Sequence, residues 1–168
     1  LTPDFGGDPS ALDAVLASRP DIFNHNIETV PRLYRMVRPG SDYGRSLQVL
    51  ARAAASCARP GRTGALPVKS GIMLGLGEEP EEVAAVLAEI RSAGAELLTI
   101  GQYLSPGSGC LPVARFVPPE EFAGWAERAR ALGFCDVLAG PFVRSSYMAE
   151  RALEEPNGRG GGGGDEAR

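Results

Sequence analysis

The feature that most constrains the fold is a repeated unit in which an apolar helical stripe, a glycine and a short apolar run follow one another. The clearest stripe, at 80–93, is ended by Gly94 and followed at once by a strand-like run at 96–100, and the unit returns over 122–138. A glycine directly after a helical stripe is a C-terminal stop signal. Helices alternating with short apolar runs are typical of parallel sheets whose strands are joined by helical crossovers. The chain is therefore expected to be an α/β protein.

The rest of the chain extends this pattern. Asp8 is placed to cap a helix that has Pro9 at its first position, and further helix and strand signals are found at 21–23 (strand), 44–56 (helix) and 68–74 (strand). About four strands are too few for a closed eight-stranded barrel of about 250 residues, but half of a barrel fits. Residues 156–168 are Gly-rich without periodicity, so we expect residues 1–155 to be the folded part and 156–168 a disordered tail.

Composition excludes several classes of function. Seventeen Lys and Arg against 21 Asp and Glu give a net charge of −4, which lacks the basic field that drives nucleic-acid binding. No apolar run approaches the roughly 20 residues that span a bilayer, so no membrane partner is expected. Cys57, Cys110 and Cys135 lie far apart, which predicts neither a disulfide framework nor a Cys-x2-Cys metal pair and favours a reducing compartment. The chain begins with Leu1 rather than Met, and we expect it to be a fragment.

Polar residues and glycines gather where the predicted strands end, which is where parallel α/β proteins place their chemistry. Asn24 and His25 follow the first strand, Gly75, Gly77 and Glu78 follow the second, and Gln102 follows the third. His25 is either a ligand-binding side chain or a satisfied turn residue. The glycine loop lacks the Gly-Lys-Ser/Thr ending of a phosphate loop, so it is either a cofactor contact or a structural turn.

Three further features call for explanation. Lys69 is the sole lysine and lies within the strand at 68–74, where it either points inward to an anionic partner or sits at the surface. Arg38 and Tyr43 belong to a polar, cationic stretch, which is either a grip on an acidic protein substrate or a solvated surface. The stretch from Arg144 to Tyr147 has two adjacent hydroxyls and serves as a helix cap, an anion site or a source of a metal ligand.

Taken together and in order, these segments resemble lipoyl synthases. The resemblance covers about residues 1 to 150 and is carried by the segments Thr2-Pro3-Asp4-Phe5, Phe23 to Tyr34, Val37 to Tyr43, Lys69 to Glu78, Gly101 to Leu104 and Gly140 to Tyr147. It implies a radical S-adenosylmethionine enzyme with a partial (β/α)6 barrel. Such enzymes insert two sulfur atoms at C6 and C8 of an octanoyl chain carried on a lysine of a lipoyl-carrier protein such as the H protein or an E2 subunit.

The resemblance also implies two [4Fe–4S] clusters, one binding S-adenosylmethionine and one consumed as the sulfur source. The family's cysteine patterns, Cys-x3-Cys-x2-Cys and Cys-x4-Cys-x5-Cys, are not found in this chain. They are expected upstream of Thr2, so the chain corresponds to a C-terminal half that is inactive alone.

The family pattern assigns roles to individual residues. Ser146, with Ser145 as second choice, corresponds to the serine that gives an oxygen ligand to the auxiliary cluster. The loop with Gly75, Gly77 and Glu78 resembles the strand that contacts adenine. By position at strand ends, the candidates for the S-adenosylmethionine carboxylate and ribose are Asn24, His25, Lys69 and Gln102. Arg38 and Tyr43 are candidates for contact with the carrier.

Two other interpretations stay open from the sequence: an inactive truncated product, and another radical sulfur transferase of the biotin-synthase type, against which the Arg-Ser-Ser-Tyr ending argues. A reductant such as ferredoxin or flavodoxin is implied as a further partner. The compartment is the cytoplasm for a bacterial protein and the plastid or mitochondrion for a eukaryotic one.

Overall fold

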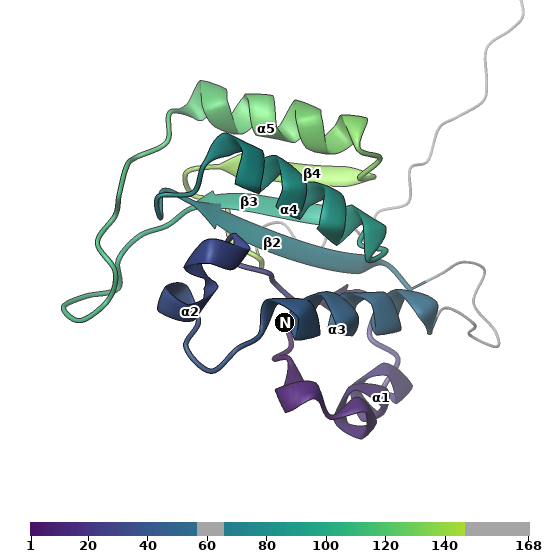
Figure 1. The fold of residues 1–168 in the computed structure, drawn as a ribbon. Helices are drawn as coiled ribbons and strands as arrows, with labels where there is room; N and C mark the ends of the chain where they lie inside the picture. The colour runs from purple at the N-terminus through teal and green to yellow at the C-terminus, as the bar shows by residue number, and fades with distance from the viewer. Residues whose placement is uncertain (57–65, 147–168) are drawn as a thin grey trace, which may run out of the picture.

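A computed structural model describes residues 1–56 and 66–146 of the 168-residue chain. Cys57 and the expected tail at 156–168 lie outside the described residues. Within the described part, four parallel strands form one sheet whose spatial order is the chain order (Figure 1): β1 (Phe23–Asn24), β2 (Val68–Leu74), β3 (Leu97–Gln102) and β4 (Asp136–Gly140). The α/β class expected from the sequence is confirmed, with the strand at 68–74 at its predicted bounds.

Helices connect the strands, and local sequence signals set their ends. The longer helices are α1 (Pro9–Ala17), α3 (Tyr43–Ala55), α4 (Pro80–Ser92) and α5 (Pro119–Ala131), and the short elements are η1 (Phe5–Gly7), η2 (Pro31–Leu33) and α2 (Tyr34–Val37). The Asp8 side chain accepts from Ser10 N at the start of α1, as the sequence predicts, and Asp42 accepts from Arg45 N at the start of α3. These bonds satisfy amides that the first helical turn leaves without partners.

Three predicted strands are displaced from their expected bounds. The first is Phe23–Asn24 rather than 21–23, the third is Leu97–Gln102 rather than 96–100, and the fourth is Asp136–Gly140 rather than 134–138. Phe134 N is bonded to Ala129 O, which closes the end of α5 after Gly133, a residue with positive φ. This closing turn uses Phe134, so the strand begins later than its apolar sequence indicates.

The two faces of the sheet differ in what covers them. Ile72 and Leu74 of β2 and Leu98 and Ile100 of β3 are buried in one core. That core also holds the apolar stripe of α4, which is Val83, Val86, Leu87 and Ile90. The alternate strand residues point to the opposite, inner face, which borders a cavity. In the described part of the chain, no helix has the length and apolar character needed to span a bilayer.

A candidate binding site on the inner face of the sheet

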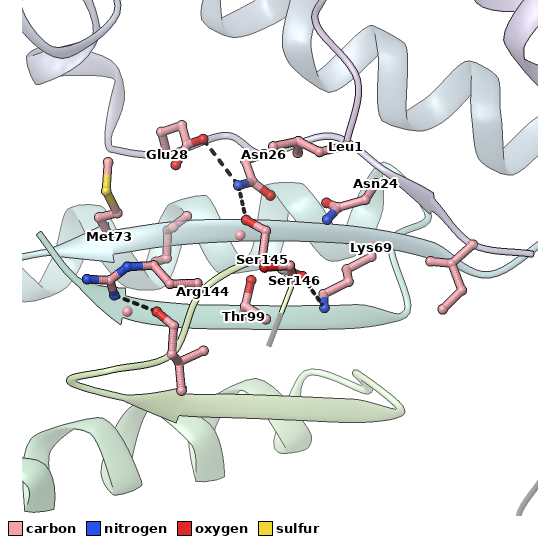
Figure 2. Close-up of a pocket in the computed structure, with 15 residues that line it drawn as sticks. Leu1, Asn24, Asn26, Glu28, Lys69, Met73, Thr99, Arg144, Ser145 and Ser146 are labelled. Carbon is pink, nitrogen blue, oxygen red and sulfur yellow. Dashed lines mark hydrogen bonds between the residues drawn. The ribbon is translucent and has the colours of Figure 1, made fainter. Parts of the chain in front are cut away.

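The inner face of the sheet forms the floor of a cavity of about 550 Å³ (Figure 2). Strand register places its residues in rows: Asn24 lies beside Lys69, and Gly71 beside Thr99. The segment after β4 lies over the sheet and lines the cavity with Arg144, Ser145 and Ser146. Leu1, Ile22, Asn26, Glu28, Ile72, Met73, Gly101 and Val143 complete the lining.

Small residues on the floor give the cavity its depth and let the chain pass close above it. A Cβ atom at Gly71 would lie 2.6 Å from Thr99 Oγ1, and one at Gly101 would lie 2.4 Å from Val143 O. Neither position has room for a side chain. The segment of residues 141–146, called the C-terminal segment below, therefore crosses the sheet in near contact with β3.

Two polar side chains from the floor hold the C-terminal segment. Lys69 Nζ donates to Ser145 O at 2.8 Å, and Asn26 Nδ2 donates to Ser145 Oγ (Figure 2). Lys69 is only 5% exposed, so it points inward and is not the surface residue that was the alternative. Burial lowers the pKa of the Lys69 ammonium, and Asp136 at the same level of the sheet opposes that shift.

Two polar atoms of residues that line the cavity are buried without a hydrogen-bond partner among the described residues. They are Asn24 Oδ1 and Asn26 Oδ1. Buried acceptors of this kind normally have a partner, so the cavity is suited to a ligand that carries hydrogen-bond donors. Glu28 also lines it, with φ of 71°. Burial raises the pKa of the Glu28 carboxyl, while the hydrogen bond from Asn26 Nδ2 acts against that rise.

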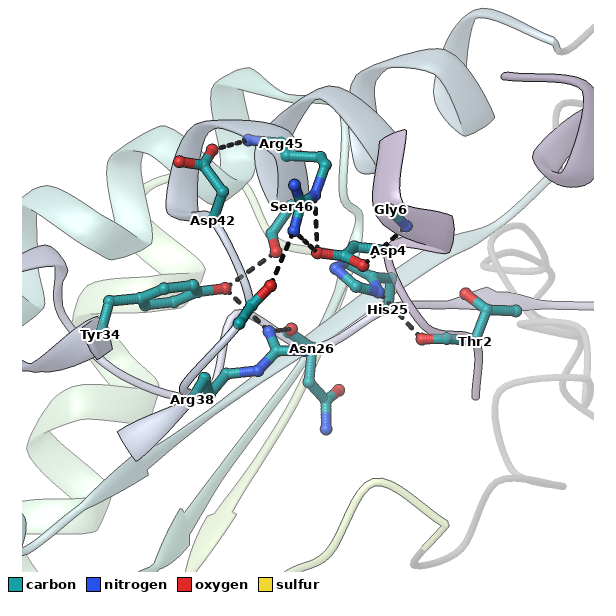
Figure 3. Close-up of polar contacts among 11 residues, drawn as sticks. Thr2, Asp4, Gly6, His25, Asn26, Tyr34, Arg38, Asp42, Arg45 and Ser46 are labelled. Atoms are coloured by element: carbon teal, nitrogen blue, oxygen red, sulfur yellow. Dashed lines mark hydrogen bonds and ion pairs between the residues drawn. The ribbon is translucent and has the colours of Figure 1, made fainter. Parts of the chain in front are cut away.

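His25 does not line this cavity. Its Nδ1 lies 2.9 Å from Thr2 O on the other side of β1, close to the Asp4–Arg45 ion pair (Figure 3). The ring is fully buried, Nε2 has no partner among the described residues, and burial lowers the pKa of His25. Neutral His25 therefore fastens the N-terminal residues to the sheet.

The glycine loop and Gln102 hold one another in place. Glu78 accepts from Gly75 N at 2.7 Å and from Leu76 N at 2.8 Å, and both Gly75 and Gly77 have positive φ. Gln102 Nε2 donates to Tyr103 O and Arg115 O, while its Oε1 accepts from Val117 N. These side chains serve the backbone of two loops, and none of the four residues lines the inner cavity.

Arg38 and Tyr43 are engaged in contacts within the fold. Arg38 Nη1 donates to Asn26 O and to Tyr34 Oη, whose hydroxyl donates in turn to Ser46 (Figure 3). Tyr43 donates to Glu89 of α4. Burial, followed by the contact with Glu89, raises the pKa of the Tyr43 hydroxyl. The role of either residue toward a carrier stays a prediction.

Of the residues singled out from the sequence, the structure brings Asn24, Lys69, Ser145 and Ser146 together at one cavity. The sequence reasoning did not select Asn26, Glu28, Gly71, Thr99 or Arg144 as site residues. For Asn26 and Glu28 the available signal was their two-residue spacing from Asn24, because every second residue of an extended chain shares a face.

The described residues hold no ligand set for a metal cluster. They contain no group of three or more His, Cys, Asp or Glu side chains placed to hold a metal ion, and both Cys110 and Cys135 are free and exposed. Iron–sulfur clusters are held mainly by several thiolates. Ser146 offers one oxygen at the cavity, so the described part of the chain is not a cluster site by itself.

The four parallel strands lie in chain order, with a helix-packed core against one face of the sheet and a cavity on the other. This is the arrangement of part of an α/β barrel. No protein-family model matches the chain. Lipoyl synthases of Acidithiobacillus ferrooxidans, Nitrosococcus oceani and Chlorobium phaeovibrioides are 54%, 55% and 52% identical to it. The matches cover 94%, 90% and 89% of this chain but 48%, 45% and 50% of those proteins. The chain is thus a homologue of lipoyl synthases and spans about half of the length of these relatives.

Proposed function

We propose that this chain is the part of a lipoyl synthase that supplies one wall of the barrel and the serine of its C-terminal segment. The complete protein inserts two sulfur atoms, at C6 and C8, into an octanoyl chain on a lysine of a carrier protein. The similarity to lipoyl synthases at about half of their length carries this proposal. The position of Ser146 at the inner cavity supports it.

S-adenosylmethionine and two [4Fe–4S] clusters supply the radical chemistry and the sulfur when bound. The residues of this chain would bind and orient the cofactor and the substrate and would enclose them. Asn24 and Lys69 face the cavity, and Asn24 offers an unpartnered acceptor to a ligand. Gly75, Gly77 and Glu78 form a turn at a strand end and, as the resemblance implies, would contact the adenine ring there. His25 and Gln102 brace the adjoining segments.

The partners follow from the same proposal. They are an octanoylated carrier such as the H protein or an E2 subunit and a reductant such as ferredoxin or flavodoxin, with Arg38 and Tyr43 as candidate carrier contacts. In a bacterium the protein acts in the cytoplasm, and in a eukaryote it acts in the plastid or mitochondrion. Six strands in a partial (β/α)6 barrel are proposed for the complete enzyme, with a Gly-rich tail after residue 155.

The test uses the complete protein, reconstituted without oxygen, with an octanoyl-lysine peptide whose mass gains are followed. Ser146→Cys should retain the auxiliary cluster, seen by iron content and optical absorption, while the dithiolated product falls strongly. Thiolate is the ordinary cluster ligand, and we expect it to release iron less readily than a hydroxyl does. Ser105→Cys, in an exposed loop, is the control and should leave turnover unchanged. Full turnover in Ser146→Cys contradicts the ligand role of Ser146, and no sulfur gain in the unmodified protein contradicts the function.

A further inference from the structure

The C-terminal segment makes its principal polar contacts with the floor of the cavity through one residue. Ser145 receives a hydrogen bond on its backbone carbonyl from Lys69 and another on its hydroxyl from Asn26 (Figure 2). The donors come from different parts of the fold, Lys69 from β2 and Asn26 from the stretch after β1. They are 76 and 119 residues away from Ser145 in the chain. Only the folded sheet can bring the three together.

Lys69 is an unusual residue for this position. It is charged, 5% exposed and set within a strand in which six of the seven residues are buried. A buried ammonium needs strong acceptors, and a hydrogen bond from a charged donor is stronger than one between neutral groups. Among the described residues, the hydrogen-bond acceptor for this ammonium is the carbonyl of Ser145, while Asp136 favours its charge from the same level of the sheet. The lysine therefore loses this hydrogen bond when the C-terminal segment leaves.

The floor of the cavity also has glycines where the C-terminal segment approaches it. Val143 O occupies the space where a side chain on Gly101 would lie, and Asn26 reaches Ser145 past the bare Cα of Gly71. Ser146 follows directly and lines the same cavity. The hydroxyl of Ser146 is held at the cavity through the seating of its neighbour.

We propose that Lys69 and Asn26 form a clamp that seats Ser145 and thereby positions Ser146 at the inner cavity. In this assignment Lys69 is a positioning residue whose ligand is the protein's own backbone, rather than a residue that binds a carboxylate of a cofactor. The use of the positioned hydroxyl rests on the proposed function. The clamp itself rests only on the contacts among the described residues.

Trypsin cleavage after Arg144 reports on the clamp, because a protease cuts a chain only where it can be drawn out locally. Arg144 is exposed while Ser145 is held. The assay follows the product that ends at Arg144 by mass, which separates it from products of cleavage at other arginines. It uses the 168-residue chain without iron, sulfide or S-adenosylmethionine.

Lys69→Met removes the donor and retains the length of the side chain. We expect cleavage after Arg144 to become about tenfold faster, equivalent to about 1.4 kcal/mol of lost seating. Lys69→Arg keeps a charged donor and should restore slow cleavage to within about threefold of the unmodified chain. Arg35→Met, which removes an exposed cation on α2, is the control and should leave the rate unchanged.

An unchanged rate in Lys69→Met, with an unchanged melting temperature, overturns the proposal, as does equally fast cleavage in the Met and Arg variants. If Lys69→Met melts so early that cleavage reports global unfolding, Ser145→Ala decides, since it removes only the acceptor of Asn26. A several-fold rise then supports the clamp, and no rise overturns it. The trypsin assay contains no cofactor. Its result therefore does not depend on whether the complete protein inserts sulfur, so the clamp and the proposed function can fail separately.

Discussion

Replacing Gln102 by Glu tests whether this side chain braces two loops, as its contacts indicate, or is available to a ligand. Gln102 is 3% exposed, donates from Nε2 to Tyr103 O at 2.9 Å and to Arg115 O at 3.1 Å, and accepts from Val117 N at 2.9 Å. Glutamate keeps the size and the acceptor for Val117. It replaces the donating amide by an oxygen that faces two carbonyl oxygens.

The expected loss of stability follows from these contacts. Two hydrogen bonds at about 1 kcal/mol each are removed, and a buried charge or an unsatisfied carbonyl adds about 1 kcal/mol more. The sum of about 3 kcal/mol corresponds to a fall in Tm of about 6–12 °C, at about 2–4 °C per kcal/mol for a domain of this size. Gln48→Glu, at an exposed position on α3, is the matched control and should shift Tm by less than about 2 °C.

The loss in Gln102→Glu should depend on pH in a defined direction. Burial and two facing carbonyls raise the pKa of the new carboxyl above its ordinary value of about 4.3. The folded state then binds a proton where the unfolded state does not, so stability falls as pH rises from about 4.3 through the raised pKa. Thermal unfolding followed by circular dichroism at pH 4.5 and pH 8, with the Gln48→Glu shifts subtracted, should show the larger deficit at pH 8. Equal melting temperatures for both variants at pH 8 would refute the bracing role.

Three further outcomes are expected from chemical unfolding. Gly71→Ala should lose about 1–3 kcal/mol, because its Cβ would lie 2.6 Å from Thr99 Oγ1; a stability equal to the unmodified chain would mean that the floor has spare room. Asp42→Ala should lose about 1 kcal/mol, because Asp42 accepts from Arg45 N at 2.7 Å at the start of α3; Asp42→Asn should recover most of it. Glu28→Gln should be more stable than the unmodified chain at pH 8, because burial raises the pKa of Glu28 and penalises its charged form. The gain in stability should shrink toward pH 4.5, and a gain that does not change with pH would contradict that reasoning.

The helices and most strands were predictable because their signals are local. Pro80, Gly94 and the stripe between them define α4 from sequence alone, and Asp8 and Pro9 define the start of α1. Strand limits were less predictable. The fourth strand begins at Asp136 because the turn that closes α5 uses Phe134. A run of apolar residues does not indicate which of them belong to the turn at the end of the preceding helix.

The site was harder to predict because β2 and β3 are buried on both faces. Every residue of β3 is buried, so polar and apolar residues do not alternate to mark the side with the cavity. Lys69 and Thr99 are the polar strand residues that lie on the inner face. Gln102 is three positions after Thr99 on β3, so it lies on the other face and turns away from the cavity. A position at a strand end predicts the edge at which a side chain lies, but not the face to which it points.

The inner face of this sheet is filled in an uncommon way, and this has a consequence for binding. Barrel interiors are usually packed with branched side chains, whereas here Gly101 leaves space that the backbone of the C-terminal segment occupies at Val143. The same segment provides Ser146 to the cavity. A ligand that contacts Ser146 therefore binds the seated arrangement better than the released one, and by linkage it must favour seating to the same degree. Ligand binding should then slow trypsin cleavage after Arg144. Lys69→Met raises the ratio of released to seated segment, and once the released state prevails, the dissociation constant of the ligand should rise by the same factor.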